Sequence, residues 1–148
     1  MISFNFKLLH RLLPVRDRLH QITPATSPTC TLCTDSCPET LQHALLSCTY
    51  SYNGGTGQVL LSTLQRFFPA LTPEKILLLQ FPDVTELQEM SSAFLTAALL
   101  LEVWNKRTKK TRISLFDIRS TLEAKVSLLR ETRNKNLYET LRDIIAVM

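Results

Sequence analysis

The fold of this chain depends most on residues 30–48, which read CTLCTDSCPETLQHALLSC. Cys30 and Cys33 have two residues between them, so one tight turn can point both sulfurs at a single metal ion. His43 follows after nine intervening residues and Cys48 after four more, a spacing typical of the second ligand pair in zinc fingers. Zinc prefers four tetrahedral ligands and accepts thiolates together with imidazole. We therefore expect these residues to fold around one Zn²⁺ held by Cys30, Cys33, His43 and Cys48.

The expected zinc is structural. Four protein ligands leave no open position for water or substrate, which separates structural from catalytic zinc sites. Residues 23–37 are too polar and Pro-rich to build a core, and a metal can supply the missing folding free energy, on the order of 10 kcal/mol in finger peptides. Cys37 is a fifth candidate, which could replace one of the four ligands or could be free. Its place just before Pro38 and an expected helix favours a free thiol.

Other uses of the cysteines fit the sequence less well. A Cys-x-x-Cys redox motif normally starts a helix in a strand–helix unit, and no such unit is predicted here. A disulfide framework needs an oxidising compartment. A zinc deaminase needs a His-x-Glu motif, whereas His10 and His20 are followed by Arg-Leu and Gln-Ile.

Composition favours an all-α fold. The 148 residues include only three Gly, while Leu is abundant; Leu is a good helix former and strand turns usually use Gly. We expect a zinc-stapled N-terminal module over residues 1–52 and a small helical bundle over residues 56–148, with a hinge at Asn53-Gly54-Gly55 between them. Apolar spacing predicts helices over residues 3–13, 14–21, 38–46, 59–68, 73–80, 84–107 and from 114 onward.

Two of these helices have further predicted roles. Residues 84–107 are apolar on several sides and are expected to form the central buried helix, with Trp104 in the core rather than stacked on a base. The last helix starts with a capping-box-like Ser114-Leu-Phe-Asp117 and carries one apolar stripe from Leu115 to Ile145. The stripe predicts a core face, or alternatively a docking face for a partner.

Positive charge is concentrated in the C-terminal third. Residues 106–148 carry eleven basic and five acidic side chains, a net of +6, while the whole chain has a net charge of +4. Five of the basic residues lie close together: Lys106, Arg107, Lys109, Lys110 and Arg112. Such a run can complement a helix dipole, bind nucleic-acid phosphates or serve as a nuclear localisation patch.

The sequence excludes some functions and locations. It contains no phosphate-binding Gly loop, no nucleophile elbow and no Asp-Asp pair for a two-metal centre, so we expect no enzyme. No signal peptide is recognisable, and the longest apolar run, residues 93–101, is far shorter than the roughly 20 residues that span a bilayer. We expect an intracellular protein without membrane contact, in the nucleus and/or cytoplasm, with reduced cysteines.

A family resemblance covers residues 8–50. LLPVRDRL at residues 12–19, Cys30-x-x-Cys33, and Glu39-Thr-x-x-His43 followed by Cys48 resemble the zinc-binding region after the polymerase domain in reverse transcriptases of LINE-type (non-LTR) retrotransposons. Residues 94–107, which end in VWNKR, look like the same tail. The resemblance implies zinc ligation by the four residues named above and binding of template RNA or target DNA. Polymerase and endonuclease motifs are absent, so the chain resembles a fragment or domesticated remnant.

Two functional hypotheses follow. The first is a non-catalytic zinc- and nucleic-acid-binding module, with Lys106, Arg107, Lys109, Lys110 and Arg112 contacting RNA or DNA. The second is a zinc-stabilised protein-interaction or structural module, whose apolar stripe docks on the polymerase portion of a reverse transcriptase or on another subunit.

Overall fold

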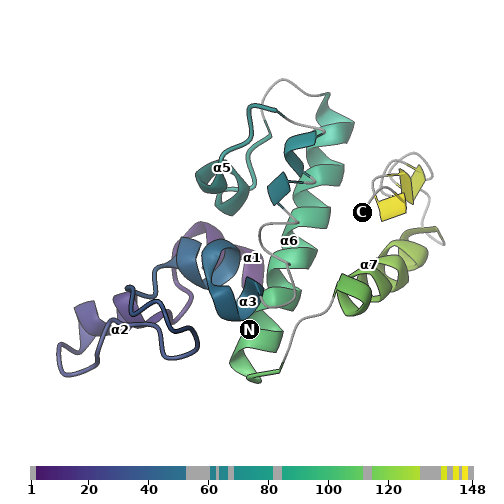
Figure 1. Cartoon of the computed structure of the whole chain (residues 1–148). Coiled ribbons are helices and arrows are strands. Elements are labelled where there is room, and N and C mark those ends of the chain that lie inside the picture. Colours follow the sequence, from purple (N-terminus) through teal and green to yellow (C-terminus); the bar gives the residue numbers. More distant parts are fainter. Residues whose placement is uncertain are drawn as a thin grey trace.

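The computed structural model describes residues 3–52, 61–62, 64–66, 69–81, 85–111, 115–130, 138–139, 142–143 and 145–146. Across these ranges the secondary structure is helical, apart from one isolated bridge between Thr29 and Pro38. The predicted all-α class is confirmed (Figure 1). The elements are α1 (Phe4–Leu9), α2 (Arg16–Ile22), the π-helix η1 (His43–Ser47), α3 (Thr49–Tyr52), α5 (Pro73–Leu77), α6 (Glu86–Thr108) and α7 (Leu115–Arg130).

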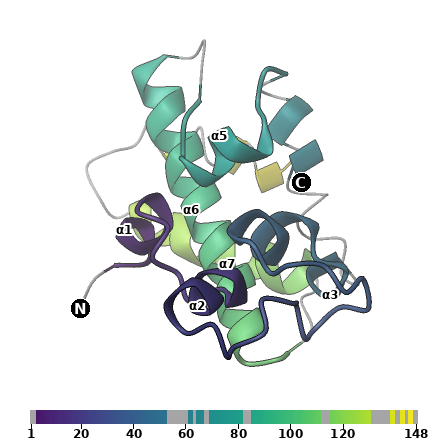
Figure 2. The same ribbon diagram turned by 90° about the vertical axis from the view of Figure 1, so that its left-hand side faces the viewer.

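Helix α6 is the centre of the fold, as predicted for residues 84–107. Its apolar positions recur every three or four residues, and Leu95, Leu99, Leu100 and Val103 are fully buried. Trp104 is partly buried against the same core. Figures 1 and 2 place α1 and α3 beside the C-terminal half of α6 and α7 along another side, and in Figure 1 α2 lies farther out. No helix among the described residues has the length and apolar character needed to cross a bilayer.

One apolar core joins the first fifty residues to the later helices. Leu8, Leu13 and Leu45 belong to the same buried cluster as Leu99 of α6 and Leu122 of α7. The predicted hinge at Gly54-Gly55 lies outside the described residues, so the division into 1–52 and 56–148 stays a prediction. Within the described part, the two halves share their core.

The apolar stripe of the last helices packs inward. Leu122 and Val126 of α7 and Ile145 near the C-terminus are at most 4% exposed and lie in the common core. The described residues 138–139, 142–143 and 145–146 are helical. The predicted cap at Ser114 lies outside the described residues, as do Leu137, Leu141 and Ile144. The stripe is therefore a core face at the positions that are described.

Several helices differ from their predicted limits. The helix predicted over residues 3–13 ends at Leu9, because Arg11 adopts a left-handed conformation (φ 53°) and the Leu12 N–H closes the helix on the Lys7 carbonyl. The next helix begins at Arg16, not at Pro14. In α5, Thr72 caps the N-terminus, since its hydroxyl accepts from the Lys75 N–H. That helix ends at Leu77 rather than at residue 80, because Leu79 is also left-handed.

The remaining predicted helices agree in part. Residues 61–62 and 64–66 are helical, as predicted within residues 59–68, and Leu64 is buried. The helix predicted from Pro38 begins only after Thr40, because Pro38 is held in the bridge to Thr29. The bridge thus divides the cysteine-rich segment into a loop with Cys30 and Cys33 and a helical turn with His43 and Cys48.

Candidate metal centre

The first two cysteines sit in a loop closed by a short hairpin. The Cys30 N–H donates to the Cys37 carbonyl at 2.9 Å, and the Glu39 N–H donates to the Pro28 carbonyl at 2.8 Å. Inside the loop, the backbone N–H groups of Leu32 and Cys33 lower the pKa of the Cys30 thiol. Backbone donors on a sulfur favour its thiolate form, the form that binds a metal.

His43 and Cys48 come from the helical turn that follows. Thr40 begins this turn, since its hydroxyl accepts from the His43 N–H at 3.1 Å. The turn is then widened to a π-helix, in which the Cys48 N–H donates to the His43 carbonyl five residues earlier. In an ordinary α-helix, residues five apart point about 140° away from each other. The wider turn brings Cys48 toward the same side as His43.

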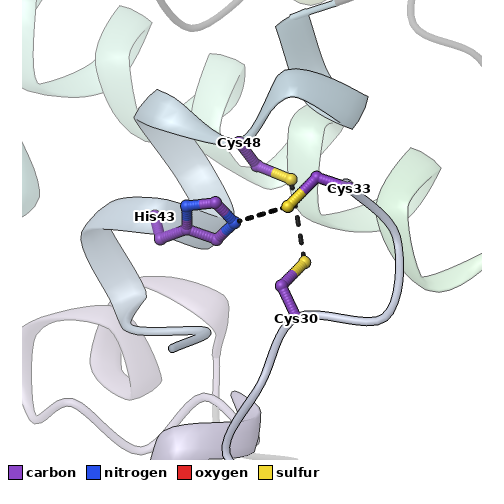
Figure 3. Close-up of side chains that lie close together, drawn as sticks. All are labelled: Cys30, Cys33, His43 and Cys48. Atoms are coloured by element: carbon purple, nitrogen blue, oxygen red, sulfur yellow. Dashed lines mark hydrogen bonds between the residues drawn. The ribbon is translucent and has the colours of Figure 1, made fainter. Parts of the chain in front are cut away.

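The four predicted ligands converge on one point. Their ligand atoms all lie within 4.8 Å of one another. Cys30 and Cys33 approach from the loop, and His43 and Cys48 from the two ends of η1 (Figure 3). Cys30, His43 and Cys48 are buried, and Cys33 is half-buried. None of the four cysteines forms a disulfide.

The spacing of these atoms fits zinc. The Cys30 and Cys48 sulfurs are 3.9 Å apart, and the Cys33 sulfur lies 3.4 Å from His43 Nε2. A tetrahedral site with Zn–S bonds of about 2.3 Å and a Zn–N bond of about 2.0 Å has edges of about 3.8 Å between sulfurs and about 3.5 Å between sulfur and nitrogen. The set of three thiolates and one imidazole is also a preferred zinc set. The cluster is thus consistent with a structural zinc site.

Cys37 lies beside His43. Its sulfur is 3.3 Å from Nδ1 and 3.6 Å from Nε2 of the His43 ring, and it is not among the four converging ligand atoms. Imidazole ligands of zinc usually donate their second ring N–H to a neighbouring acceptor. With the metal at Nε2, Cys37 is placed to accept from Nδ1.

Arg107 of α6 reaches into the centre and was not expected there. Its residue is 4% exposed, and its guanidinium donates to the Cys48 sulfur at 3.2 Å, the Cys30 sulfur at 3.1 Å and Glu39 Oε2 at 2.6 Å. The prediction that Arg107 contacts nucleic acid is therefore corrected: a guanidinium buried among two sulfurs and a carboxylate does not present itself to a phosphate.

Glu39 links three parts of the structure. Oε2 accepts from Arg107, while Oε1 accepts from the backbone N–H of Arg16 at 3.1 Å. Arg16 is the first residue of α2, and the preceding Val15 provides no side-chain cap. A carboxylate at a helix N-terminus satisfies a free donor and complements the helix dipole. Glu39 thus connects the start of α2 to the end of α6 beside the cysteines.

The environment changes the acidity of these groups. Burial opposes ionisation of Cys30, but hydrogen bonds from two backbone N–H groups, Arg107 and His43 outweigh it and lower the pKa of Cys30 to about 6. Burial raises the pKa of Cys33 to about 12, and the nearby Cys30 and Cys48 sulfurs add to the increase. Burial opposes the charge of Arg107, yet its contacts with Cys48, Cys30 and Glu39 raise its pKa above the usual value. Arg107 therefore stays charged.

The other residues of the basic run differ from Arg107. Lys109 and Lys110 are exposed and Lys106 is partly exposed, all at the C-terminal end of α6. Arg112 lies outside the described residues. Helical periodicity could have distinguished Arg107 from Lys106 in the sequence. Arg107 follows the buried Val103 by four residues and so continues the buried face, whereas Lys106 follows the half-buried Glu102.

Comparison with known proteins gives a family match for the segment that holds this centre. Searches of curated proteins and of solved structures found no match. A family model described as zinc-binding in reverse transcriptase matches residues 1–53, the segment that contains all four converging ligands. Arg107 lies beyond the matched segment. The N-terminal 53 residues of this chain therefore match the family of zinc-binding domains found in reverse transcriptases.

Proposed function

We propose that the protein is a non-catalytic module that binds RNA or DNA in support of a reverse transcriptase of the LINE type. The observation that supports this most is the position of Lys109 and Lys110. Both are exposed at the end of α6, and Arg107 ties that helix end to the zinc-binding segment. Exposed lysines on a fixed element suit phosphate contacts, which supply most non-specific nucleic-acid affinity.

Other features agree with a polyanionic ligand. Lys110 is left-handed (φ 53°), and the Thr111 N–H closes the helix on the Lys106 carbonyl. The described residues of the basic run, up to Lys110, therefore sit on a compact helix end instead of an extended tail. The carbonyl end of a helix also favours neighbouring cations, so the lysines are held where they are stable without a ligand.

The test is a titration of labelled single-stranded RNA, single-stranded DNA and duplex DNA at several salt concentrations. We expect micromolar binding that weakens as salt rises. Replacing Lys109 and Lys110 by Glu should weaken binding by about tenfold or more and reduce the slope of log affinity against log salt by about 1.5. Zinc content and helicity should stay unchanged.

The matched control is the double variant Lys75→Glu with Lys125→Glu. It changes the net charge by the same amount but places the charges on α5 and α7. If the control weakens binding as much as Lys109→Glu with Lys110→Glu, the interface is not at the end of α6. No binding by the wild-type protein at low salt would reject the function.

A second candidate is a protein-interaction module, and one observation favours it. The first 22 residues expose several apolar side chains, with Phe6 44%, Leu9 42% and Ile22 67% exposed. A groove of about 600 Å³ lies nearby, lined in part by Leu41 and Leu77. This hypothesis predicts self-association or binding of a hydrophobic dye. A strictly monomeric protein by sedimentation that binds no dye would argue against it.

A further inference from the structure

The zinc-binding segment has a partner outside itself. Arg107 comes 59 residues after Cys48 and 68 after Glu39, yet its guanidinium contacts both. Both terminal guanidinium nitrogens are used: Nη1 donates to Cys48, and Nη2 donates to Cys30 and Glu39. The side chain is almost fully withdrawn from solvent, at 4% exposure. A buried arginine needs such partners, because an uncompensated buried charge is strongly unfavourable.

The charges at the centre explain why a cation is needed. Zn²⁺ with three thiolates and a neutral imidazole carries a formal charge of −1, and the buried Glu39 carboxylate brings the sum to −2. Arg107 reduces this to −1. Hydrogen bonds from a cation to metal-bound sulfurs also fix the positions of the ligands and lower their negative charge.

We propose that Arg107 and Glu39 form the outer shell of the zinc site, so that zinc binding and the docking of the end of α6 stabilise each other. Coupling between two equilibria is reciprocal. Zinc that orders Cys30 and Cys48 therefore strengthens the hold on Arg107, and a docked Arg107 strengthens zinc binding. The inference rests on the zinc site and is independent of nucleic-acid binding.

The geometry requires arginine at this position. Three acceptors from two separate segments lie within 3.2 Å of the two terminal guanidinium nitrogens. A planar fork reaches such divergent acceptors together, whereas a lysine ammonium is a single point charge. Glu39 then holds the fork while also capping α2.

The experiment compares zinc affinity in three variants by competition with a chromogenic chelator. We expect Arg107→Gln to bind zinc at least about tenfold more weakly than the wild-type protein. Arg107→Lys keeps the charge but loses the fork and should fall between the two. Lys106→Gln removes a charge from the same helical turn at a partly exposed position, so its affinity should change by no more than about twofold.

The second readout is amide hydrogen exchange with and without zinc. If Arg107 had only a structural role, its replacement would not change which residues zinc protects. In the wild-type protein we expect zinc to protect residues 30–48 and also residues 103–108 at the end of α6. In Arg107→Gln, zinc should protect residues 30–48 alone. If Arg107→Gln matches Lys106→Gln in both readouts, the proposal is overturned. If Arg107→Gln does not fold in excess zinc, Arg107→Lys is the deciding variant. The proposal is overturned if Arg107→Lys binds zinc with wild-type affinity and shows wild-type zinc-dependent protection of residues 103–108.

Discussion

Residues 16–37 and helix α6 are stabilised in different ways. Helix α2 has no buried residue, and between residues 23 and 37 Cys30 is the single buried position. In α6, by contrast, every residue from 95 to 100 is buried. The first segment therefore brings little apolar surface into the core, whereas the second is surrounded by it.

This difference shows what the metal contributes. Ordering a residue costs about 1–2 kcal/mol of backbone entropy, and α6 offsets that cost by burying leucines. The segment before η1 depends mainly on hydrogen bonds, among them those of its short hairpin and of Glu39. A bound zinc can supply free energy on the order of 10 kcal/mol, which is enough to order such a segment.

The largest expected effect comes from removing a ligand. Cys48→Ser should lose zinc and the structure of residues 16–37, while α6 and α7 keep most of their helicity because their apolar core does not include the metal. Zinc content by mass spectrometry and hydrogen exchange resolved by segment would measure both consequences. Chelation of the wild-type protein should produce the same pattern.

Cys37→Ser is the matched control for this change. The Cys37 sulfur contacts the His43 ring but is not one of the four converging atoms. The variant should keep one zinc per chain, with a modest loss of affinity because a second contact of His43 is weakened. If Cys37→Ser loses zinc and Cys48→Ser keeps it, the ligand set is different from the one proposed.

A smaller effect is expected from the apolar core. Leu99→Ala removes a side chain that is 1% exposed in α6 and should lower the free energy of unfolding by about 2–5 kcal/mol. Denaturant unfolding of the zinc-loaded protein would measure it. Zinc stoichiometry should not change while the variant is folded.

Leu19→Ala makes the same chemical change in α2. Leu19 is 37% exposed, so little packing is lost and the cost should stay within about 1 kcal/mol. Equal losses for Leu19→Ala and Leu99→Ala would mean that the two regions do not differ in how they are stabilised.

The sequence predicted the features that depend on spacing and periodicity. The ligand positions in residues 30–48 follow from cysteine spacing, and the limits of α6 were predicted to within two residues. Helix ends at Arg11 and Leu79 were harder to predict, because non-glycine residues adopt the left-handed conformation there. A chain with three Gly offers few such markers.

The role of Arg107 could not be read from charge. Five basic residues close together suggested one exposed patch, but a helix distributes consecutive residues over different faces. Arg107 lies on the face of Val103, and Glu39 meets it from 68 residues away. Periodicity alone can predict that Arg107 is buried; its partners depend on how the hairpin and α6 pack, which no local pattern encodes.

The smallest expected effect comes from the left-handed residues that end α1 and α6, where the two regions should respond alike. Arg11 ends α1 near the zinc segment and Lys110 ends α6, both with φ 53°. Replacing either by Gly should raise the free energy of unfolding by about 0.5–1 kcal/mol, because Gly lacks the Cβ that makes this conformation unfavourable. The corresponding Ala variants keep the Cβ and should give no gain in denaturant unfolding. A gain in stability at Lys110 without one at Arg11 would show that the left-handed backbone of Arg11 does not lower the free energy of unfolding. The two regions would then differ in their helix ends as well.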